Sequence, residues 1–547
     1  MRCVSALVLR TATVVNFSKA HYNPYRLAAQ AFILEGLLLL DILVNTTSRE
    51  TRIALLEQHV VTELFIEQHT RQGMVGNIYR GRVAKILPGM QAAFVDIGLP
   101  KAGFLHVYDI RVEQHTLPWD PETTPLDLGS RREVAEAQPS LFPEPAYAIE
   151  ELLAEGQEIL VQVAKEPLGT KGCRLTTYVT LAGRYLVLMP GVEQVGVSRR
   201  IAEEAEKERL RTCVRALLPD GMGCIVRTLS AGATPQELQS DLHFLTALWH
   251  LVQQRAGQVS APGLVHQDLD LVLRTLRDFL TAEVRQVIID APQAYERART
   301  FVQSMAVPQM AANLVFYHDP VPLFEAFGIE REIERALQRK VWLKSGSHIT
   351  IDYTEALVAI DVNTGRFVGT RDPASTILTT NLEAVAEIVR QLRLRNLGGL
   401  VVIDFIDMDT DDHKQRVFQA LEDALRHDRA RTRILPMSVF GLVEMTRQRV
   451  RASLDQVLCE PCNYCHGTGR TEASATVCSK VLREIQRVMR VTPHTKKVMV
   501  NVHHSVASRL YNEERAHVAA LEQAGQITLT IQGDHDMPPG HFEVLSL

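Results

Sequence analysis

The sequence lacks a hydrophobic run long enough to cross a membrane. Its longest apolar stretch, from Ala31 to Val44, contains Glu35 and Asp41 and falls short of the ~20 apolar residues that a spanning helix needs. The N-terminus resembles a signal peptide only faintly, because Arg10 interrupts its apolar part and no small-residue cleavage site follows. We therefore expect a cytoplasmic protein without a membrane span.

The sequence also lacks an excess of positive charge, low-complexity tracts and internal repeats. Its 59 Lys and Arg residues are outnumbered by 64 Asp and Glu residues, and the net charge is −5. A polycationic chain is thereby excluded, so a nucleic acid could be bound only through local basic patches. With 547 residues, of which 46% are hydrophobic, the chain is long enough for about three or four folded domains.

Residues 75–177 contain short segments with the alternating pattern of β-strands. Small barrels of the OB type stack exposed bases on aromatic side chains and bind phosphates with neighbouring basic groups. Phe94 and Phe104 are candidates for stacking and Lys171 for phosphate contact, although both phenylalanines could instead belong to a barrel core. Residues 109–155, rich in Pro, Glu and Asp, predict a long exposed loop with one short helix near its end.

Two later apolar runs each stop at an aspartate, Asp361 after the first run and Asp404 after the second. Between them apolar residues recur at helical spacing, with Asn381 as a possible N-cap and Gly398 near the end. A strand–helix–strand crossover usually places its two strands parallel. Both aspartates would then lie at the same edge of the sheet, where α/β sheets carry their sites.

Asn363 lies two residues after Asp361 and therefore shares its face of an extended strand. Two converging carboxylates repel each other unless a cation lies between them. Oxygen ligands with room for water suit Mg²⁺, and bound Mg²⁺ can polarise a phosphoryl oxygen and activate water. The pattern predicts Asp361 and Asp404 as Mg²⁺ ligands; the structural alternative is that each Asp only caps its own strand.

Arginines are concentrated in and after this predicted unit. They are Arg390, Arg393, Arg395, Arg429, Arg431, Arg433, Arg447, Arg449 and Arg451. Charge runs are usually solvated faces, but their concentration in one segment of an acidic chain favours a polyanionic partner.

A C-x-x-C-x-G-x-G pattern begins at Cys462 and includes Cys465. Two thiolates at this spacing suit one half of a tetrahedral zinc site, and the sequence lacks a second C-x-x-C to complete it. Either Cys459 and His466 supply the missing ligands, or two chains share one zinc. The same letters match the attachment motif of c-type haem, which we disfavour because that chemistry requires export. Plain structural cysteines are the third alternative.

Together these motifs resemble the ribonuclease E/G family, and its ribonuclease G branch in particular, from about Leu38 to the C-terminus. The most specific segments are residues 76–98, 168–190, 360–368, 390–408 and 441–469. Val341–Lys344 and Asn363–Gly369 favour the ribonuclease G branch. Two departures stand out. Loop 109–155 is longer than the family's pattern, and residues 1–38 are either an added extension or the product of a wrongly chosen start codon.

The resemblance implies a multidomain α/β (α+β) fold, with RNase H-like and DNase I-like subdomains, an inserted S1 RNA-binding barrel and a zinc knuckle. The implied ranges are 1–38 for the extension, 39–74 and 273–336 for the two parts of the RNase H-like subdomain, 75–177 for the S1 domain, 178–272 for a 5′-phosphate sensor domain, 337–458 for the DNase I-like catalytic domain, 459–470 for the zinc link and 471–547 for a small C-terminal domain.

The resemblance also implies site residues and partners. Asp361 and Asp404 would hold Mg²⁺, and Asn363 would orient or contact the scissile phosphate. The 5′-monophosphate pocket would be formed by Gly183, Val187, Arg227, Thr228 and Arg431. Cys462 and Cys465 would share Zn²⁺ between the chains of a homodimer, which can pair into a tetramer.

The implied substrates are A/U-rich single-stranded segments of rRNA precursors and of decaying mRNA, cut to give 5′-phosphate and 3′-hydroxyl ends. The rival interpretation is a non-catalytic RNA-binding scaffold with a structural zinc. Such a scaffold would tolerate replacement of either Asp361 or Asp404 in every RNA assay.

Overall fold

The chain divides into two compact units, residues 1–451 and 452–547, each described by itself. The computed structural model describes residues 40–69, 73–111, 147–167, 172–305, 312–365, 373–426, 428–449, 451–465 and 467–547. The predicted extension, Lys171 and His466 lie outside these ranges, as do residues 112–146 of the predicted loop. The short helix predicted near the end of that loop is present as α3 (Ile149–Leu152). None of the described helices is both long and apolar enough to span a membrane.

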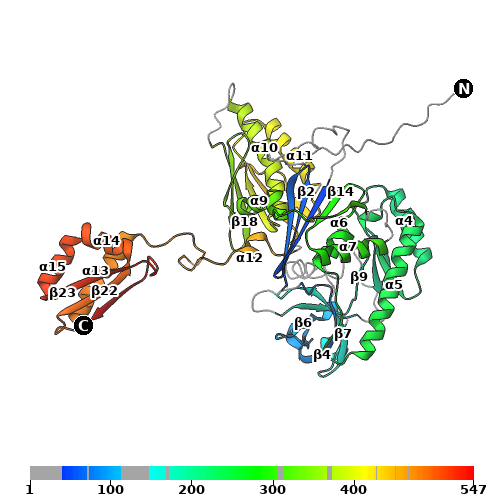
Figure 1. Ribbon diagram of the computed structural model, residues 1–547, viewed down its shortest axis with the longest axis horizontal. Helices are drawn as coiled ribbons and strands as arrows, with labels where there is room; N and C mark the ends of the chain where they lie inside the picture. The colour runs from blue at the N-terminus through cyan, green and yellow to red at the C-terminus, as the bar shows by residue number, and fades with distance from the viewer. Residues whose placement is uncertain are drawn as a thin grey trace. The chain divides into compact units, whose positions relative to one another are not determined.

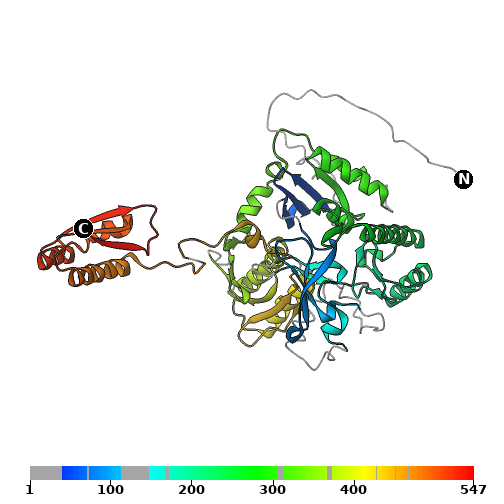
Figure 2. The ribbon, with the colours of Figure 1, turned by 90° about the horizontal axis from the view of Figure 1, so that it is seen from below.

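The first sheet of the larger unit joins two distant parts of the sequence. Its strand order is β15-β14-β1-β2-β3, and β1 pairs in parallel with β14, so the blue and green strands lie together in Figures 1 and 2. The strands are β1 (Leu40–Thr46), β2 (Glu50–Glu57), β3 (Val60–Gln68), β14 (Val284–Ile289) and β15 (Leu314–Phe316). Side chains of α6 (Leu271–Phe279) and α7 (Pro292–Ser304) complete the core of this sheet.

A closed barrel follows β3 in the chain. Its strands pair in the order β4-β5-β6-β8-β7, and β7 pairs back to β4, which closes the barrel. The five strands are β4 (Ile78–Leu87), β5 (Ala92–Asp96), β6 (Gly103–His106), β7 (Glu158–Lys165) and β8 (Arg174–Thr176). A sixth strand, β13 (Gly263–His266), pairs with β4 from outside the barrel. The OB-like barrel predicted from the alternating pattern is therefore present.

A small α/β domain follows the barrel strands in the sequence and precedes α6. Its sheet has the order β11-β12-β10-β9. Its elements are β9 (Leu181–Ala182), β10 (Leu186–Pro190), β11 (Val195–Val197), α4 (Glu204–Leu217), β12 (Met222–Val226) and α5 (Pro235–Gln258). Buried residues of α4 and α5 pack against the sheet in one hydrophobic cluster. Thr234 and Glu237 form a capping box at the N-terminus of α5: the side chain of each accepts the backbone N–H of the other.

The predicted strand–helix–strand crossover lies in a six-stranded sheet of the order β16-β17-β18-β19-β21-β20. Only β18 and β19 pair in parallel. The elements are α8 (Leu323–Ala326), α9 (Ile329–Ala336), β16 (Lys340–Trp342), β17 (His348–Tyr353), β18 (Leu357–Asn363), α10 (Pro373–Leu394), β19 (Gly399–Asp404), α11 (Asp411–Leu425), β20 (Thr432–Ile434) and β21 (Leu442–Arg447).

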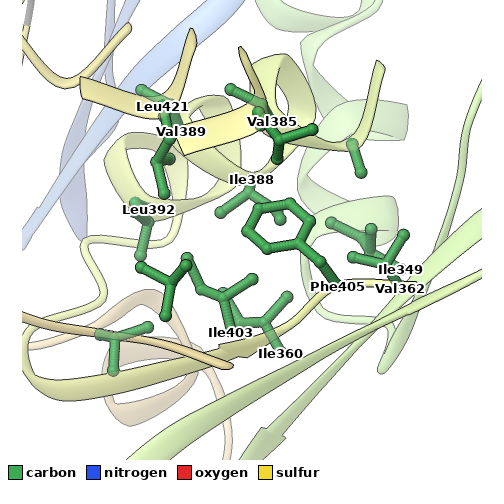
Figure 3. Packing of buried hydrophobic residues seen from close by; sticks show 14 of the residues in the cluster. Ile349, Ile360, Val362, Val385, Ile388, Val389, Leu392, Ile403, Phe405 and Leu421 are labelled. Carbon is green, nitrogen blue, oxygen red and sulfur yellow. The ribbon is translucent and has the colours of Figure 1, made fainter. Parts of the chain in front are cut away.

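One face of this sheet is covered by α10 and α11. Figure 3 shows side chains of α10 packed on Ile360 and Ile403 of the parallel strands. Because side chains alternate along a strand, the residues between the buried ones point to the opposite face, which we call the open face. It carries Lys340, Trp342, His348, Thr350, Asp361, Asn363, Asp404 and Leu442, none of which is buried.

The prediction that Asn381 caps this helix is wrong, because α10 already begins at Pro373. Asn381 is fully buried within the helix. Its Nδ2 donates to the Ile406 carbonyl (2.9 Å) and its Oδ1 accepts the Ile406 N–H (3.1 Å). A buried amide needs such partners, so Asn381 fixes the loop after β19. The predicted helix end is confirmed: Asn396 and Gly399 have positive φ there.

The smaller unit contains a three-stranded sheet of the order β23-β22-β24, with β22 parallel to β23. Its elements are α12 (Leu454–Leu458), α13 (Ser474–Val491), β22 (Lys497–His503), α14 (His504–Asn512), α15 (Arg515–Gly525), β23 (Thr528–Asp534) and β24 (Phe542–Ser546).

Candidate functional site

The two predicted aspartates lie side by side on the open face. Asp361 and Asp404 are register partners across the parallel pair β18–β19, and both side chains are exposed. Asp404 is the last residue of β19, and Asp361 precedes the end of β18 by two residues. The crossover through α10 therefore does what the sequence predicted: it brings two carboxylates together at one edge.

The environment of these carboxylates favours a cation. Partial burial raises the pKa of Asp404, and the neighbouring carboxylates of Asp361 and Asp407 raise it further. Asn363 donates from Nδ2 to Oδ2 of Asp361 (2.7 Å), which fixes one oxygen of that carboxylate. Asp407 was not selected from the sequence, although its position three residues after Asp404 could have indicated it.

The loop that carries Asp407 is held from two sides. Besides the clamp by Asn381, Phe405 is buried in the sheet core (Figure 3). On the other side Gly441 has a φ of +77°, and a Cβ at this position would lie 3.5 Å from Oδ1 of Asp407. Asp361 and Asp404 therefore lie at strand ends, and Asp407 lies in a loop whose position is fixed. Catalytic groups need this kind of rigid support.

Within the described ranges, no three His, Cys, Asp or Glu side chains are grouped so that they could hold a metal ion. A cation beside Asp361 and Asp404 would therefore take these carboxylate oxygens and complete its shell with water or substrate oxygens. Mg²⁺ commonly binds in this way, through one or two carboxylates with several waters retained. The donor set fits Mg²⁺ better than a metal that prefers nitrogen or sulfur.

The predicted phosphate-sensing residues lie around β10 and β12. Arg227 donates to the Gly183 carbonyl (2.6 Å) and to Oδ1 of Asp278 (2.7 Å). Thr228 shares a hydrogen bond of 2.9 Å with the Ser198 hydroxyl. The structure therefore brings Gly183 and Arg227 into direct contact, with Thr228 next in the chain.

Val187 and Arg431 complete the predicted set. Val187 is 7% exposed and pairs across β10–β12 with Ile225, two residues before Arg227. Arg431 is exposed and lies immediately before β20. Two residues before it, the Arg429 carbonyl accepts a hydrogen bond from Arg200 (2.5 Å), and the Arg429 guanidinium donates to the Asp278 carbonyl (3.2 Å). The segment leading to Arg431 is thus tied to the surroundings of Arg227.

Sequence reasoning missed two aspartates that hold this region. Burial raises the pKa of Asp278, but the guanidinium groups of Arg227 and Arg277 outweigh it and bring the pKa down to about 2. The Asp241 carboxylate accepts N–H groups of residues 184–186. A Cβ at Gly183 would come within 2.5 Å of this carboxylate, so the position requires glycine. Neither aspartate lies in a motif, and no local pattern could have identified them.

The inference from the number of arginines was wrong for most of them. Arg390 and Arg393 pair with glutamates of α9, α10, β2 and β3. Arg395 and Arg447 are buried, and Arg447 pairs with Asp428. The remaining internal contacts are made by Arg449 with the Gly398 carbonyl, Arg451 with the Phe65 ring and Arg429 with the Phe279 ring. These cations mainly join parts of the chain, whereas Arg431 and Arg433 are exposed.

The barrel phenylalanines form a cross-strand pair. Phe94 on β5 faces Phe104 on β6, with ring centres 6.1 Å apart in an edge-to-face arrangement. Both are half-buried and do not belong to the buried barrel core. The aromatic row continues from Phe104 to His106 (6.4 Å) and on to the exposed Tyr108 (5.2 Å). Because His106 is only 6% exposed, the accessible rings of the row are Phe94, Phe104 and Tyr108, and accessible rings of this kind are surfaces on which bases stack.

In the smaller unit, Cys459 and Cys462 are exposed, Cys465 is half-buried, and all three thiols are free. Backbone N–H groups of Gly469 and Gly467 hold the pKa of the Cys465 thiol below its ordinary value, and the Cys462 side chain also lowers it. The glycines of the motif thus favour a thiolate, the form that binds metal. No third ligand is placed beside this pair by the described residues, from which His466 is missing.

Comparison with known proteins gives two family matches. The sequence model of the ribonuclease E/G family matches residues 180–450, and that described as RNase E/G, Thioredoxin-like domain, matches residues 461–547. The chain is 44% identical to ribonuclease G of Escherichia coli (strain K12), over 88% of this chain and 94% of that protein. It is 43% identical to ribonuclease G of Haemophilus influenzae, over 87% and 92%. Ribonuclease E of H. influenzae is 39% identical over 92% of this chain and 52% of its own length.

Proposed function

The chain belongs to the ribonuclease E/G family, and from this premise we propose that it is a Mg²⁺-dependent endoribonuclease acting on single-stranded, A/U-rich RNA. The observation that carries the proposal is the pairing of Asp361 with Asp404 on an open sheet face. Two exposed carboxylates held together by strand pairing serve no packing purpose, and they suit a site for a hard cation.

Asp361 and Asp404 would hold the Mg²⁺, which when bound polarises a phosphoryl oxygen and lowers the pKa of water. Asn363 orients the Asp361 carboxylate through its hydrogen bond and contacts the scissile phosphate. The aromatic row of the barrel holds the strand, so that the phosphodiester is positioned for in-line attack by water. The products carry 5′-phosphate and 3′-hydroxyl ends.

The same proposal includes a preference for RNA with a 5′-monophosphate. Arg227, Thr228, the backbone at Gly183 and Val187, and Arg431 would form the pocket for this terminal group. Arginine and hydroxyl donors suit a phosphate dianion. The hydrogen bonds from Arg227 to the Gly183 carbonyl and Asp278 support the proposal, because they hold the guanidinium in a defined orientation before any ligand arrives.

We further propose that Cys462 and Cys465 bind Zn²⁺ together with the same two residues of a second chain. The lowered pKa of Cys465 supports this assignment, since two thiolates supply half of a tetrahedral shell. The enzyme would then be a homodimer, able to pair into a tetramer, that matures rRNA precursors and degrades mRNA in the cytoplasm.

The test is cleavage of a 5′-monophosphorylated, A/U-rich, single-stranded RNA with Mg²⁺ by the wild-type chain and by Asp404→Asn. The exposed Asp412 of α11 provides a matched control, Asp412→Asn. We expect internal cutting by the wild type and the control, and a loss of roughly 1000-fold or more in Asp404→Asn with RNA binding retained. Tight binding without cutting by all three proteins would favour the RNA-binding scaffold instead.

A further inference from the structure

Three side chains at the edge of the open face form a cluster outside the residues used so far. Both Lys340 and His348 contact Trp342: the Lys340 ammonium is 4.3 Å from the centre of the indole ring, and the His348 ring centre is 5.3 Å from it. Despite these neighbours, 56% of Trp342 remains exposed. We call Lys340, Trp342 and His348 the edge cluster.

Strand register connects the edge cluster to the paired carboxylates. Trp342 pairs with His348 across β16–β17, and His348 pairs with Asn363 across β17–β18. In the next row Lys340 pairs with Thr350, which pairs with Asp361. Directly paired residues in neighbouring strands point to the same face, so cluster and carboxylates share the open face. Lys340 and Trp342 on β16 are separated from Asp361 on β18 by two strand spacings, roughly 10 Å.

An indole that is more than half exposed contributes little to a core. Large aromatic side chains stabilise a fold through the area that they bury, and Trp342 does not belong to the hydrophobic cluster of this sheet. Its neighbours instead make it suitable for a nucleotide. An aromatic face beside a cation binds a base by stacking and its phosphate by charge.

We propose that the edge cluster binds one nucleotide of the RNA strand beside the cleavage site, with its base stacked on Trp342 and its phosphate paired with Lys340. This inference rests on the proposed function and deepens it. Lys340 leaves the indole to meet the phosphate, while His348 stays in contact with the ring. Stacking tolerates any base, so the cluster adds affinity and register without selecting a sequence.

The first test compares Trp342→Ala and Trp342→Phe with the wild type. The substrates are a 5′-monophosphorylated RNA and a set of the same RNA with one abasic nucleotide at successive positions near the cut. For Trp342→Ala on the intact RNA we expect kcat/KM to fall roughly tenfold, mainly through KM, and Trp342→Phe should restore most of it. One abasic position should lower kcat/KM of the wild type by a similar factor and leave Trp342→Ala unaffected.

Phe244 of α5 provides the matched control, because its side chain is 51% exposed and lies outside the catalytic sheet. Phe244→Ala should cleave like the wild type and keep its sensitivity to the abasic position. Two results would overturn the inference. One is a Trp342→Ala enzyme with wild-type kcat/KM. The other is an equal loss on intact RNA and on every abasic RNA, which would indicate a purely structural role for Trp342.

A binding measurement separates failure of this inference from failure of the proposed function. In the Asp404→Asn chain, stacking of a base on Trp342 should quench tryptophan fluorescence when RNA is added, and the additional change Trp342→Phe should remove that quenching. If the wild type cuts no RNA, quenching that depends on Trp342 would still support the edge cluster as a nucleotide site. RNA binding without such quenching would refute it.

Discussion

Asn363 donates a hydrogen bond of 2.7 Å to Asp361, which lies two residues earlier on the same strand. The bond occupies one carboxylate oxygen and sets the plane of the group. We expect Asn363→Ala to lower kcat by roughly 10- to 100-fold, as loss of a supporting group at a metal ligand does. Single-turnover cleavage at saturating RNA measures this effect. Asn512→Ala, at an exposed position of α14, should leave kcat unchanged, and an equally active Asn363→Ala would contradict the assigned role.

Replacement of Arg227 tests the sensing of the RNA 5′ end. Arg227→Gln should lower the ratio of cleavage of 5′-monophosphate RNA to cleavage of 5′-hydroxyl RNA roughly 10-fold or more, because it deletes a charge-assisted contact to the phosphate. Cleavage of the 5′-hydroxyl RNA should stay within about twofold, which separates sensing from chemistry. The control is Arg211→Gln on α4, where Arg211 pairs with Glu208 one helical turn earlier. An unchanged ratio in Arg227→Gln would place the sensor elsewhere.

The depressed pKa of Asp278 predicts how its contribution to stability depends on pH. Its pKa is about 2 in the fold against ~3.9 in an unfolded chain, so the folded state favours the carboxylate. The contribution, about 2 kcal/mol, is present above pH ~4 and is lost as pH falls through about 2.

We therefore expect Asp278→Asn to lower the urea midpoint at pH 6, and the difference from the wild type to shrink to roughly half by pH 3. Urea unfolding followed by circular dichroism at several pH values measures this. Asp220→Asn, at an exposed position between α4 and β12, should match the wild type throughout. A difference that stays constant from pH 6 to pH 3 would show that the ionised carboxylate is not the source of the stabilisation.

The half-buried pair Phe94 and Phe104 predicts a specific loss of RNA affinity. Phe104→Ala should weaken binding of single-stranded RNA roughly 5- to 50-fold, since one stacked base is lost, and Phe94→Ala should act on the same surface. Because the rings touch, the double variant should lose less than the product of the two factors. Binding is measured by fluorescence anisotropy with the Asp404→Asn chain. Phe104→Tyr should bind normally, and wild-type affinity in both alanine variants would assign the pair to packing.

Replacement of cysteines distinguishes the two ways of completing the zinc site. Cys462→Ser together with Cys465→Ser should abolish zinc content, measured by elemental analysis, and convert dimers to monomers in light scattering. Cys459→Ser should change neither if two chains share the metal. Loss of zinc in Cys459→Ser without loss of the dimer would instead favour ligands from a single chain. The half-buried Cys213 offers the control Cys213→Ser.

The sequence by itself determined the features that depend on local pattern. Alternation predicted the strands of the barrel, and helical spacing between two apolar runs predicted the crossover that pairs Asp361 with Asp404. These predictions succeeded because period and chain direction fix which face and which strand end a residue occupies. The sequence also showed the paired cysteines and the glycines that follow them. Only the fold showed that backbone N–H groups of Gly467 and Gly469 favour a thiolate at Cys465.

Tertiary structure alone decided which charged and aromatic side chains remain available. Arg390 and Arg393 looked like polyanion contacts, yet glutamates up to 336 residues away in sequence neutralise them. The structure pairs Asp278 with Arg227 and places Trp342 on the same sheet face as the carboxylates, through pairings that no local pattern encodes. The physical reason is that ion pairs and strand registers join residues from distant parts of the sequence. Sequence periodicity, by contrast, depends only on residues a few positions apart.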